Sequence, residues 1–142
     1  ESMNTPKVLT FPLQRHRDNR GYLEEVFRPE MLPPEHREFG QCFLTTARPG
    51  IVKGNHYHHS KYELFYLVKG HATVYFKDLE TEETSEVEMS EDDPKVLLIP
   101  PGPLHAIKNT GNSDFYLMVY TDKRSMEVDQ DDQDTFYRAW IE

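Results

Sequence analysis

The sequence predicts an all-β protein, built as a sandwich or a barrel, on three observations. Short runs of strand-forming residues alternate with clusters of Gly, Pro, Asn and Asp along the whole chain. Helical periodicity is weak almost everywhere. The 142 residues, of which 37% are hydrophobic, are enough for one domain with a core and too few for two ordinary domains. We therefore expect a single domain of short, closely spaced strands.

The strands are expected in three sections of the chain. Two strands lie in the N-terminal section, 7–27, and eight more make the core of the domain, about residues 40–122. "EMLPPEHREFG" between these sections holds one helical turn, which its two prolines limit. The C-terminal section, 123–142, ends in a short helix or a strand laid on a partner, whose Phe136, Trp140 and Ile141 need burial. The expected strands are 7–12, 21–27, 41–47, 51–58, 63–69, 71–77, 83–89, 95–99, 105–109 and 114–121.

The composition excludes several classes of partner. A net charge of −9 argues against a nucleic-acid surface, and the longest apolar run, "VLLIPP", is too short to span a membrane. The acidic runs at 78–93 and 127–134 indicate solvated faces or loops. Cys42, the single cysteine, excludes an internal disulfide, and we read it as a small core residue. With no secretory pattern at the start, we expect a cytoplasmic protein.

Three of the seven histidines fall within the stretch "HYHH" at 56–59. On a strand, residues two apart share a face, so His56 and His58 point the same way. Glu63 follows after a four-residue turn, and a hairpin of that kind returns a carboxylate beside the two imidazoles. His105 begins a later strand, after a Pro-Gly-Pro corner. Three histidines and a carboxylate suit a divalent ion such as zinc, iron, manganese or nickel. His16, His36, His59 and His71 are read as surface or packing residues.

This spacing resembles that of the cupin superfamily. The first cupin motif runs Gly, five residues, His-x-His, four residues, Glu, six residues, Gly, and the chain keeps every interval from Gly50 to Gly70. The second motif matches from Pro100 to Asn109, with Pro94 in place of its opening glycine. The resemblance implies a double-stranded β-helix (jelly roll) cupin barrel over a single domain, 1–142, with a metal site inside the barrel mouth. The implied ligands are His56, His58, Glu63 and His105, with zinc as the first choice of ion.

The stretches that flank these motifs resemble the nucleotide-sugar cupins. "DNRGYLEEVFRPE" and "TTARPGIVKGNHYHH" are similar to segments of the dTDP-4-keto-6-deoxyhexose 3,5-epimerases, the sugar 3,4-ketoisomerases and, over most of the chain, the cupin domain of CapF-type capsular-polysaccharide assembling proteins. The resemblance implies that Arg20 binds the nucleotide-sugar. Lys53 stands where arginine is usual, to bind substrate and take part in catalysis. His56 matches the catalytic base of the metal-free epimerases. Strand alternation separates Lys53 from His56, so Gly54 must bend or bulge the strand.

The leading hypothesis is a metal-dependent epimerase or isomerase that acts on a nucleotide-activated keto-deoxysugar in surface polysaccharide biosynthesis. The general-acid tyrosine of the 3,5-epimerases has no counterpart in "TDKRSMEVD", and Phe43 lies near the place of the ketoisomerase tyrosine. A metal-dependent cupin dioxygenase and a non-catalytic sugar-binding cupin are the alternatives. We further expect a homodimer that covers the sheet edges, and a basic rim at the barrel mouth for the anionic ligand. The rim residues are Arg15, Arg17 and Arg20.

Overall fold

The computed structural model describes residues 7–122 and 134–142, and within these ranges nearly all of the regular secondary structure is β-strand. Two single turns of 3-10 helix, η2 (Pro29–Met31) and η3 (Pro34–His36), occupy the stretch in which one helical turn was expected. The strands are β1 (Leu9–Pro12), β2 (His16–Asp18), β3 (Gly21–Leu23), β4 (Gln41–Ala47), β5 (Val52–His58), β6 (Glu63–Lys69), β7 (His71–Lys77), β8 (Thr84–Ser90), β9 (Lys95–Ile99), β10 (Leu104–Asn109), β11 (Phe115–Thr121) and β12 (Thr135–Tyr137).

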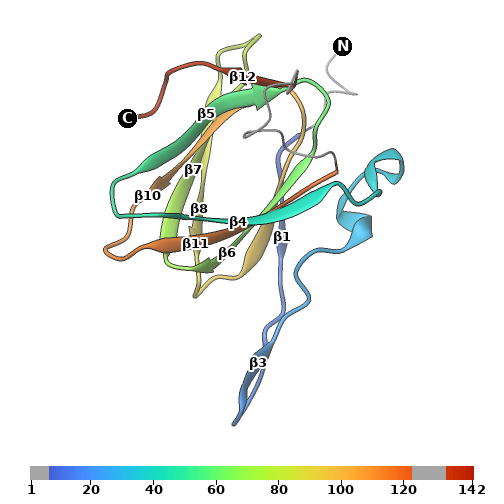
Figure 1. Cartoon of the computed structure of the whole chain (residues 1–142), viewed down its shortest axis with the longest axis vertical. Coiled ribbons are helices and arrows are strands. Elements are labelled where there is room, and N and C mark those ends of the chain that lie inside the picture. Colours follow the sequence, from blue (N-terminus) through green and yellow to red (C-terminus); the bar gives the residue numbers. More distant parts are fainter. Residues whose placement is uncertain (1–6, 123–133) are drawn as a thin grey trace.

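Two five-stranded antiparallel sheets face each other and form the barrel (Figure 1). The first sheet has the order β1-β9-β6-β11-β4, and the second has the order β12-β5-β10-β7-β8. Alternate residues of both sheets point inward and fill the space between them with aromatic and branched side chains, because side chains alternate along a strand. The inward residues include Phe65, Leu67, Val74, Phe76, Ile99, Phe115 and Leu117. The all-β jelly roll is thereby confirmed.

The outer face of the first sheet is also apolar, and the N-terminal part of the chain covers much of it. Leu64, Tyr66 and Leu98 point outward there and pack with Met31 and Leu32 from the segment that holds η2. This cover explains why β6 is buried on both faces from Glu63 to Leu67 instead of alternating.

Strands β2 and β3 pair only with each other and form an arm that projects from the barrel (Figure 1). At its base, Nε of Arg15 donates to the buried carboxylate of Glu24 over 2.6 Å. The hydroxyl of Tyr66 on β6 donates to the same carboxylate. The sequence predicted one strand over 21–27, but the strand ends at Leu23. The pairing ends at His16 and Leu23, and beyond it the side chains of Arg15 and Glu24 meet in the ion pair at the base of the arm.

One expectation about an apolar residue is wrong: Cys42 is exposed and is not a core residue, because it lies on the outward-facing side of β4. The C-terminal section forms a strand, β12, laid on β5 of the same chain, where the ring of Phe136 stacks on Tyr57 and on His59. Phe136 and Trp140 are half-buried there, and Trp140 lies 6.3 Å, centroid to centroid, from Tyr75. The acidic run at 127–134 lies outside the described residues except for Asp134. No helical segment of the described ranges has the length and apolar character that crossing a bilayer requires.

Candidate metal centre

A bulge in β5 determines where the side chains of this strand point. The pairing of β5 with β10 shifts by one residue between His105 and Ala106, so that Asn55 is the additional residue. Gly54 has φ of +98°, and a Cβ added there would lie 3.0 Å from the carbonyl oxygen of His105. Asn55 has φ of 57°, a region that asparagine tolerates better than most residues. This is the bulge at Gly54 that the sequence required, and Lys53 and His56 consequently line the same cavity.

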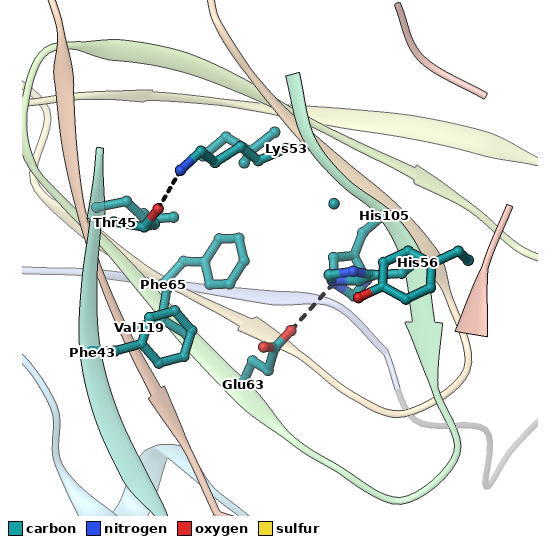
Figure 2. Close-up of a pocket in the computed structure, with 12 residues that line it drawn as sticks. Phe43, Thr45, Lys53, His56, Glu63, Phe65, His105 and Val119 are labelled. Carbon is teal, nitrogen blue, oxygen red and sulfur yellow. Dashed lines mark hydrogen bonds and ion pairs between the residues drawn. The ribbon is translucent and has the colours of Figure 1, made fainter. Parts of the chain in front are cut away.

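Strands of both sheets bring the four predicted ligands together. His56 and His58 come from β5, His105 from the neighbouring β10, and Glu63 from β6 in the opposite sheet. One candidate ligand atom from each residue lies within 4.8 Å of all the others. Oε1 of Glu63 is 3.2 Å from Nε2 of His105 and 3.3 Å from Nε2 of His58. Figure 2 shows Glu63 directed across the cavity toward His105.

The ligand atoms have the separation and the unsatisfied bonding that a shared ion requires. Ligands about 2.1 Å from a tetrahedral ion lie about 3.4 Å from one another, close to the Glu63–histidine distances. Four buried polar atoms have no hydrogen-bond partner in the described structure, and each belongs to one of these residues. They are Nδ1 of His56, Nε2 of His58, Oε1 of Glu63 and Nε2 of His105. Buried polar atoms are rarely left unpaired, so the residues fit a cation.

The other ring nitrogens of His58 and His105 are held by backbone oxygens. Nδ1 of His105 donates to the carbonyl of Pro103 over 3.1 Å, and Nδ1 of His58 donates to the carbonyl of Asp134 over 3.3 Å. A carbonyl oxygen can only accept, so in each ring the proton sits on Nδ1 and the lone pair of Nε2 faces the cluster. This is the tautomer that a metal-ligating imidazole needs.

The electrostatics also favour a cation. Burial, with His105 adding to it, lowers the pKa of His56 to about 3, so its imidazole is neutral at physiological pH. Burial alone would raise the pKa of Glu63, but the imidazoles of His105 and His58 next to its Oε1 outweigh burial and hold that pKa well below its ordinary value. A neutral imidazole and an ionised carboxylate are the forms that bind a metal ion.

The cluster lies at one end of a cavity of about 410 Å³, which is within the usual size of a small-molecule site. Phe43 and Val119 lie across the cavity from His56 and His105 (Figure 2). Nζ of Lys53 donates to the hydroxyl of Thr45 over 2.7 Å at another side of the space. The cavity therefore combines a metal-binding end, an apolar wall and one ammonium group.

Among the polar residues that line this cavity, sequence reasoning missed two. Tyr137 on β12 lines it, with its ring edge-on to His56 at a centroid distance of 5.5 Å. The sequence contained no signal for this contact, because it depends on β12 pairing with β5. Thr45 also lines the cavity, and its position two residues after Phe43 could have indicated it, since both face inward from β4.

The expected basic rim is not formed by the three N-terminal arginines of this chain. Arg15 is bound to Glu24, with its guanidinium 4.3 Å from the ring centroid of Tyr22, and Arg17 lies over the same ring. Arg20 sits in the turn of the arm, pairs with Asp18 and has a side chain that is 86% exposed. None of the three lines the cavity, because the arm leaves the barrel on the outer side of the first sheet.

Comparison with known proteins places the chain among proteins of polysaccharide biosynthesis. A family model described as "Polysaccharide biosynthesis C-terminal domain" matches residues 16–136. The spore coat polysaccharide biosynthesis protein SpsL of Bacillus subtilis is 34% identical over 126 residues, which are 85% of this chain and 82% of that protein. A UDP-2-acetamido-2,6-beta-L-arabino-hexul-4-ose reductase of Pseudomonas aeruginosa is 29% identical, but the match covers 89% of this chain and only 32% of the reductase.

Solved structures show the same fold. The capsular polysaccharide assembling protein CapF of Staphylococcus aureus aligns with a TM-score of 0.66 and 32% identity, over 89% of this chain and 34% of CapF. A dTDP sugar isomerase of Desulfovibrio desulfuricans aligns with a TM-score of 0.78 and 19% identity, over 93% of this chain and 83% of the isomerase. The chain thus spans most of SpsL and of the isomerase, but about a third of CapF.

Proposed function

The chain belongs to the polysaccharide biosynthesis C-terminal domain family, and we propose that it is a metal-dependent epimerase or isomerase of a nucleotide-activated keto-deoxysugar. The observation that carries the proposal is the four-ligand cluster at the end of a cavity that also presents Lys53. The names of the relatives support the substrate class, since they include a UDP-linked hexul-4-ose and a dTDP sugar. The same names support surface polysaccharide biosynthesis as the process, and we propose the cytoplasm as the location.

We propose zinc as the resident ion, with iron, manganese and nickel as the alternatives. Three imidazoles and one carboxylate are ordinary zinc ligands, and the distances from Oε1 of Glu63 to Nε2 of His58 and of His105 are close to the separation of ligands around a tetrahedral ion. The proposed ligands are His56, His58, Glu63 and His105. When bound, such an ion supplies the positive charge that stabilises the oxygen of an enolate.

The residues around the cluster suit a sugar that carries a ketone and a methyl group. Phe43, Phe65 and Val119 offer an apolar wall against which a deoxy carbon can pack without losing hydrogen bonds. Lys53 offers three donors and a charge, of which one bond goes to Thr45, so it can also bind a phosphate or a keto oxygen. We propose Lys53 as the substrate-binding and catalytic cation of the cavity.

Epimerisation and ketoisomerisation both require a proton to leave a carbon next to the ketone and to return to another face or carbon. His56 is the proposed base when the cluster holds no ion. An imidazole that ligates an ion through its buried Nδ1 has no free lone pair, so His56 cannot be both ligand and base. For the metal-loaded protein we propose that Tyr137 carries out both transfers: its phenolate takes the proton from the carbon next to the ketone, and the phenol so formed returns it, because its ring lies against His56 and lines the cavity.

Hydrogen exchange at the substrate carbon tests this function directly. Protein loaded with zinc is incubated in deuterium oxide with dTDP- and UDP-linked 4-keto-6-deoxyhexoses, and the C–H signals next to the ketone are followed by NMR. We expect deuterium at one such carbon at a rate well above the protein-free background. Chelated protein and His58→Ala should lose this exchange. His71→Ala is the matched control, because His71 lies on the outer surface with its Nδ1 bonded to Thr110.

The other hypotheses predict different outcomes of the same measurement. Iron-dependent oxygen consumption without exchange would identify a dioxygenase. Saturable binding of the nucleotide-sugar with no exchange in any metal form would identify a non-catalytic sugar-binding protein. Exchange that persists in chelated wild type but is lost in His56→Ala would contradict the metal-dependent mechanism and support His56 as a free base.

A further inference from the structure

The last described segment of the chain, which we call the C-terminal strap (134–142), lies along β5, the strand that carries two candidate ligands (Figure 1). Within β12, Thr135 pairs with His58 and Tyr137 pairs with His56. The side-chain amide of Asn55 anchors the end of the strap, because its Nδ2 donates to the carbonyl of Ile141 over 2.9 Å and its Oδ1 accepts from the amide of Ile141 over 3.0 Å. The strap therefore follows the bulged strand along the metal-binding cluster.

Asp134 at the start of the strap caps the turn between β5 and β6. Its Oδ1 accepts from the amide of Ser60 over 3.0 Å and from the hydroxyl of Ser60 over 2.9 Å. Its Oδ2 accepts from the amide of Lys61 over 3.1 Å. This turn joins His58, the last residue of β5, to Glu63, the first residue of β6. One carboxylate thus fixes the connection between two of the four candidate ligands.

The backbone at the same position holds one of these ligands directly. The carbonyl oxygen of Asp134 accepts from Nδ1 of His58 over 3.3 Å, and the hydroxyl of Thr135 lies 3.3 Å from the same nitrogen. These contacts fix both the tautomer and the ring orientation of His58, with Nε2 toward Glu63. If the strap left β5, His58 would lose both contacts and the turn before Glu63 would lose its cap.

We propose that Asp134 is a positioning residue of the metal centre, and that docking of the strap on β5 and binding of the ion favour each other. The inference rests on the metal-dependent function proposed above. Asp134 acts through His58 and through the turn before Glu63. Partners that orient metal ligands in this way typically change metal affinity by about 10- to 100-fold when they are removed.

The test compares Asp134→Ala and Asp134→Asn with a matched control, Asp78→Ala. Asp78 caps a different hairpin turn, between β7 and β8, by accepting from the amides of Glu80 and Thr81 over 2.8 and 3.0 Å. Both variants lose a carboxylate that accepts from the backbone amides of a turn, but only Asp134 joins a distant segment to the turn between His58 and Glu63. Zinc affinity is measured by competition with a chelator, and the visible spectrum of the cobalt-substituted protein reports ligand geometry. Melting temperatures of the metal-free proteins give the purely structural effect.

We expect Asp134→Ala to weaken zinc binding about 10- to 100-fold and to change the cobalt spectrum. Asp134→Asn keeps one acceptor oxygen and should lie between Asp134→Ala and wild type. Asp78→Ala should lower the melting temperature without changing zinc affinity or the cobalt spectrum. Should Asp134→Ala fail to fold, the affinity and spectrum of Asp134→Asn decide the question.

Two results would overturn the inference, and they can be told apart. If wild type binds zinc but the Asp134 variants bind it equally tightly with an unchanged cobalt spectrum, Asp134 is only a turn cap and the metal centre stands without it. If wild type binds neither zinc nor cobalt, the metal-dependent function fails together with the inference.

Discussion

At the residue scale, the positive φ angles of Gly54 and Asn55 determine which side chains of β5 reach the cavity. Without the extra residue, Lys53 would point away from the face that carries His56. A side chain at Gly54 would also press on the backbone of His105, so the same position allows β5 and β10 to approach closely. The ammonium group and the candidate ligands therefore share a cavity because of two backbone conformations.

His56 gives the metal-free protein a specific dependence on pH. Its pKa is about 3 in the folded chain, whereas an unfolded histidine titrates near 6.5. Between these values the unfolded chain binds the additional proton, so the free energy of unfolding must fall as the pH is lowered. The contribution of His56 between pH 7 and pH 4 is at most about 3 kcal/mol.

Urea unfolding of chelated protein at pH 7, 5.5 and 4 measures this effect. We expect His56→Asn to be less sensitive to acid than wild type over this range, since the replacement cannot titrate. His16→Asn, at an exposed position of the arm, should retain the full wild-type slope. Equal slopes for wild type and His56→Asn would show that His56 accepts a proton in the folded chain.

At the element scale, the strands of the barrel core could be predicted from the sequence because alternation and turn residues are local. The strand expected at 51–58 begins one residue later, at Val52, and the strand expected at 105–109 begins one residue earlier, at Leu104. The ligand set was predictable for the same reason, since His-x-His on a strand places both rings on one face. The paired arm could not be predicted from the sequence. Strand β2 has few strand-forming residues, and Glu24 is placed by tertiary contacts with Arg15 and Tyr66. The contact of Tyr137 with His56 likewise depends on a pairing between distant segments.

If the C-terminal strap and the ion favour each other, removing the ion must loosen the strap by the same factor, because coupling between two binding events is reciprocal. The reporting amides are those of Arg138, which donates to the carbonyl of Asn55 over 2.8 Å, and of Ser60 and Lys61 at Asp134. Hydrogen exchange followed by mass spectrometry should show these amides exchanging about tenfold faster after chelation.

The amides of Glu80 and Thr81, capped by Asp78, provide the internal control for this experiment. They should exchange at the same rate with and without zinc. A strap that exchanges at one rate in both forms would mean that its docking is independent of the ion.

At the scale of the whole molecule, two features remain without a function inside a single chain. The first is the arm, which carries Arg20 away from the cavity that it was expected to serve. The second is an apolar area on the outer face of the first sheet, where Leu44 and Tyr116 lie on neighbouring strands and are 55% and 40% exposed. Half-buried Met118 pairs with Leu44 within this area. A second copy of the chain would cover such a surface. In that dimer the arm of one copy could bring its Arg20 to the cavity of the other copy.

We therefore predict a homodimer, held in part by this face. During gel filtration at micromolar concentration, the protein should elute at twice its 16.7 kDa. Leu44→Glu should shift it to the monomer without unfolding it, because the side chain points outward and buries little in the chain itself, while a charge at an apolar interface loses its hydration. Glu86→Lys, a charge change on the outer side of the second sheet, is the control and should remain dimeric.

If Arg20 binds the nucleotide-sugar from the partner's arm, Arg20→Ala should weaken substrate binding while the dimer persists. A monomeric wild type would exclude both the dimer and this role of Arg20, because within one chain the arm does not reach the cavity.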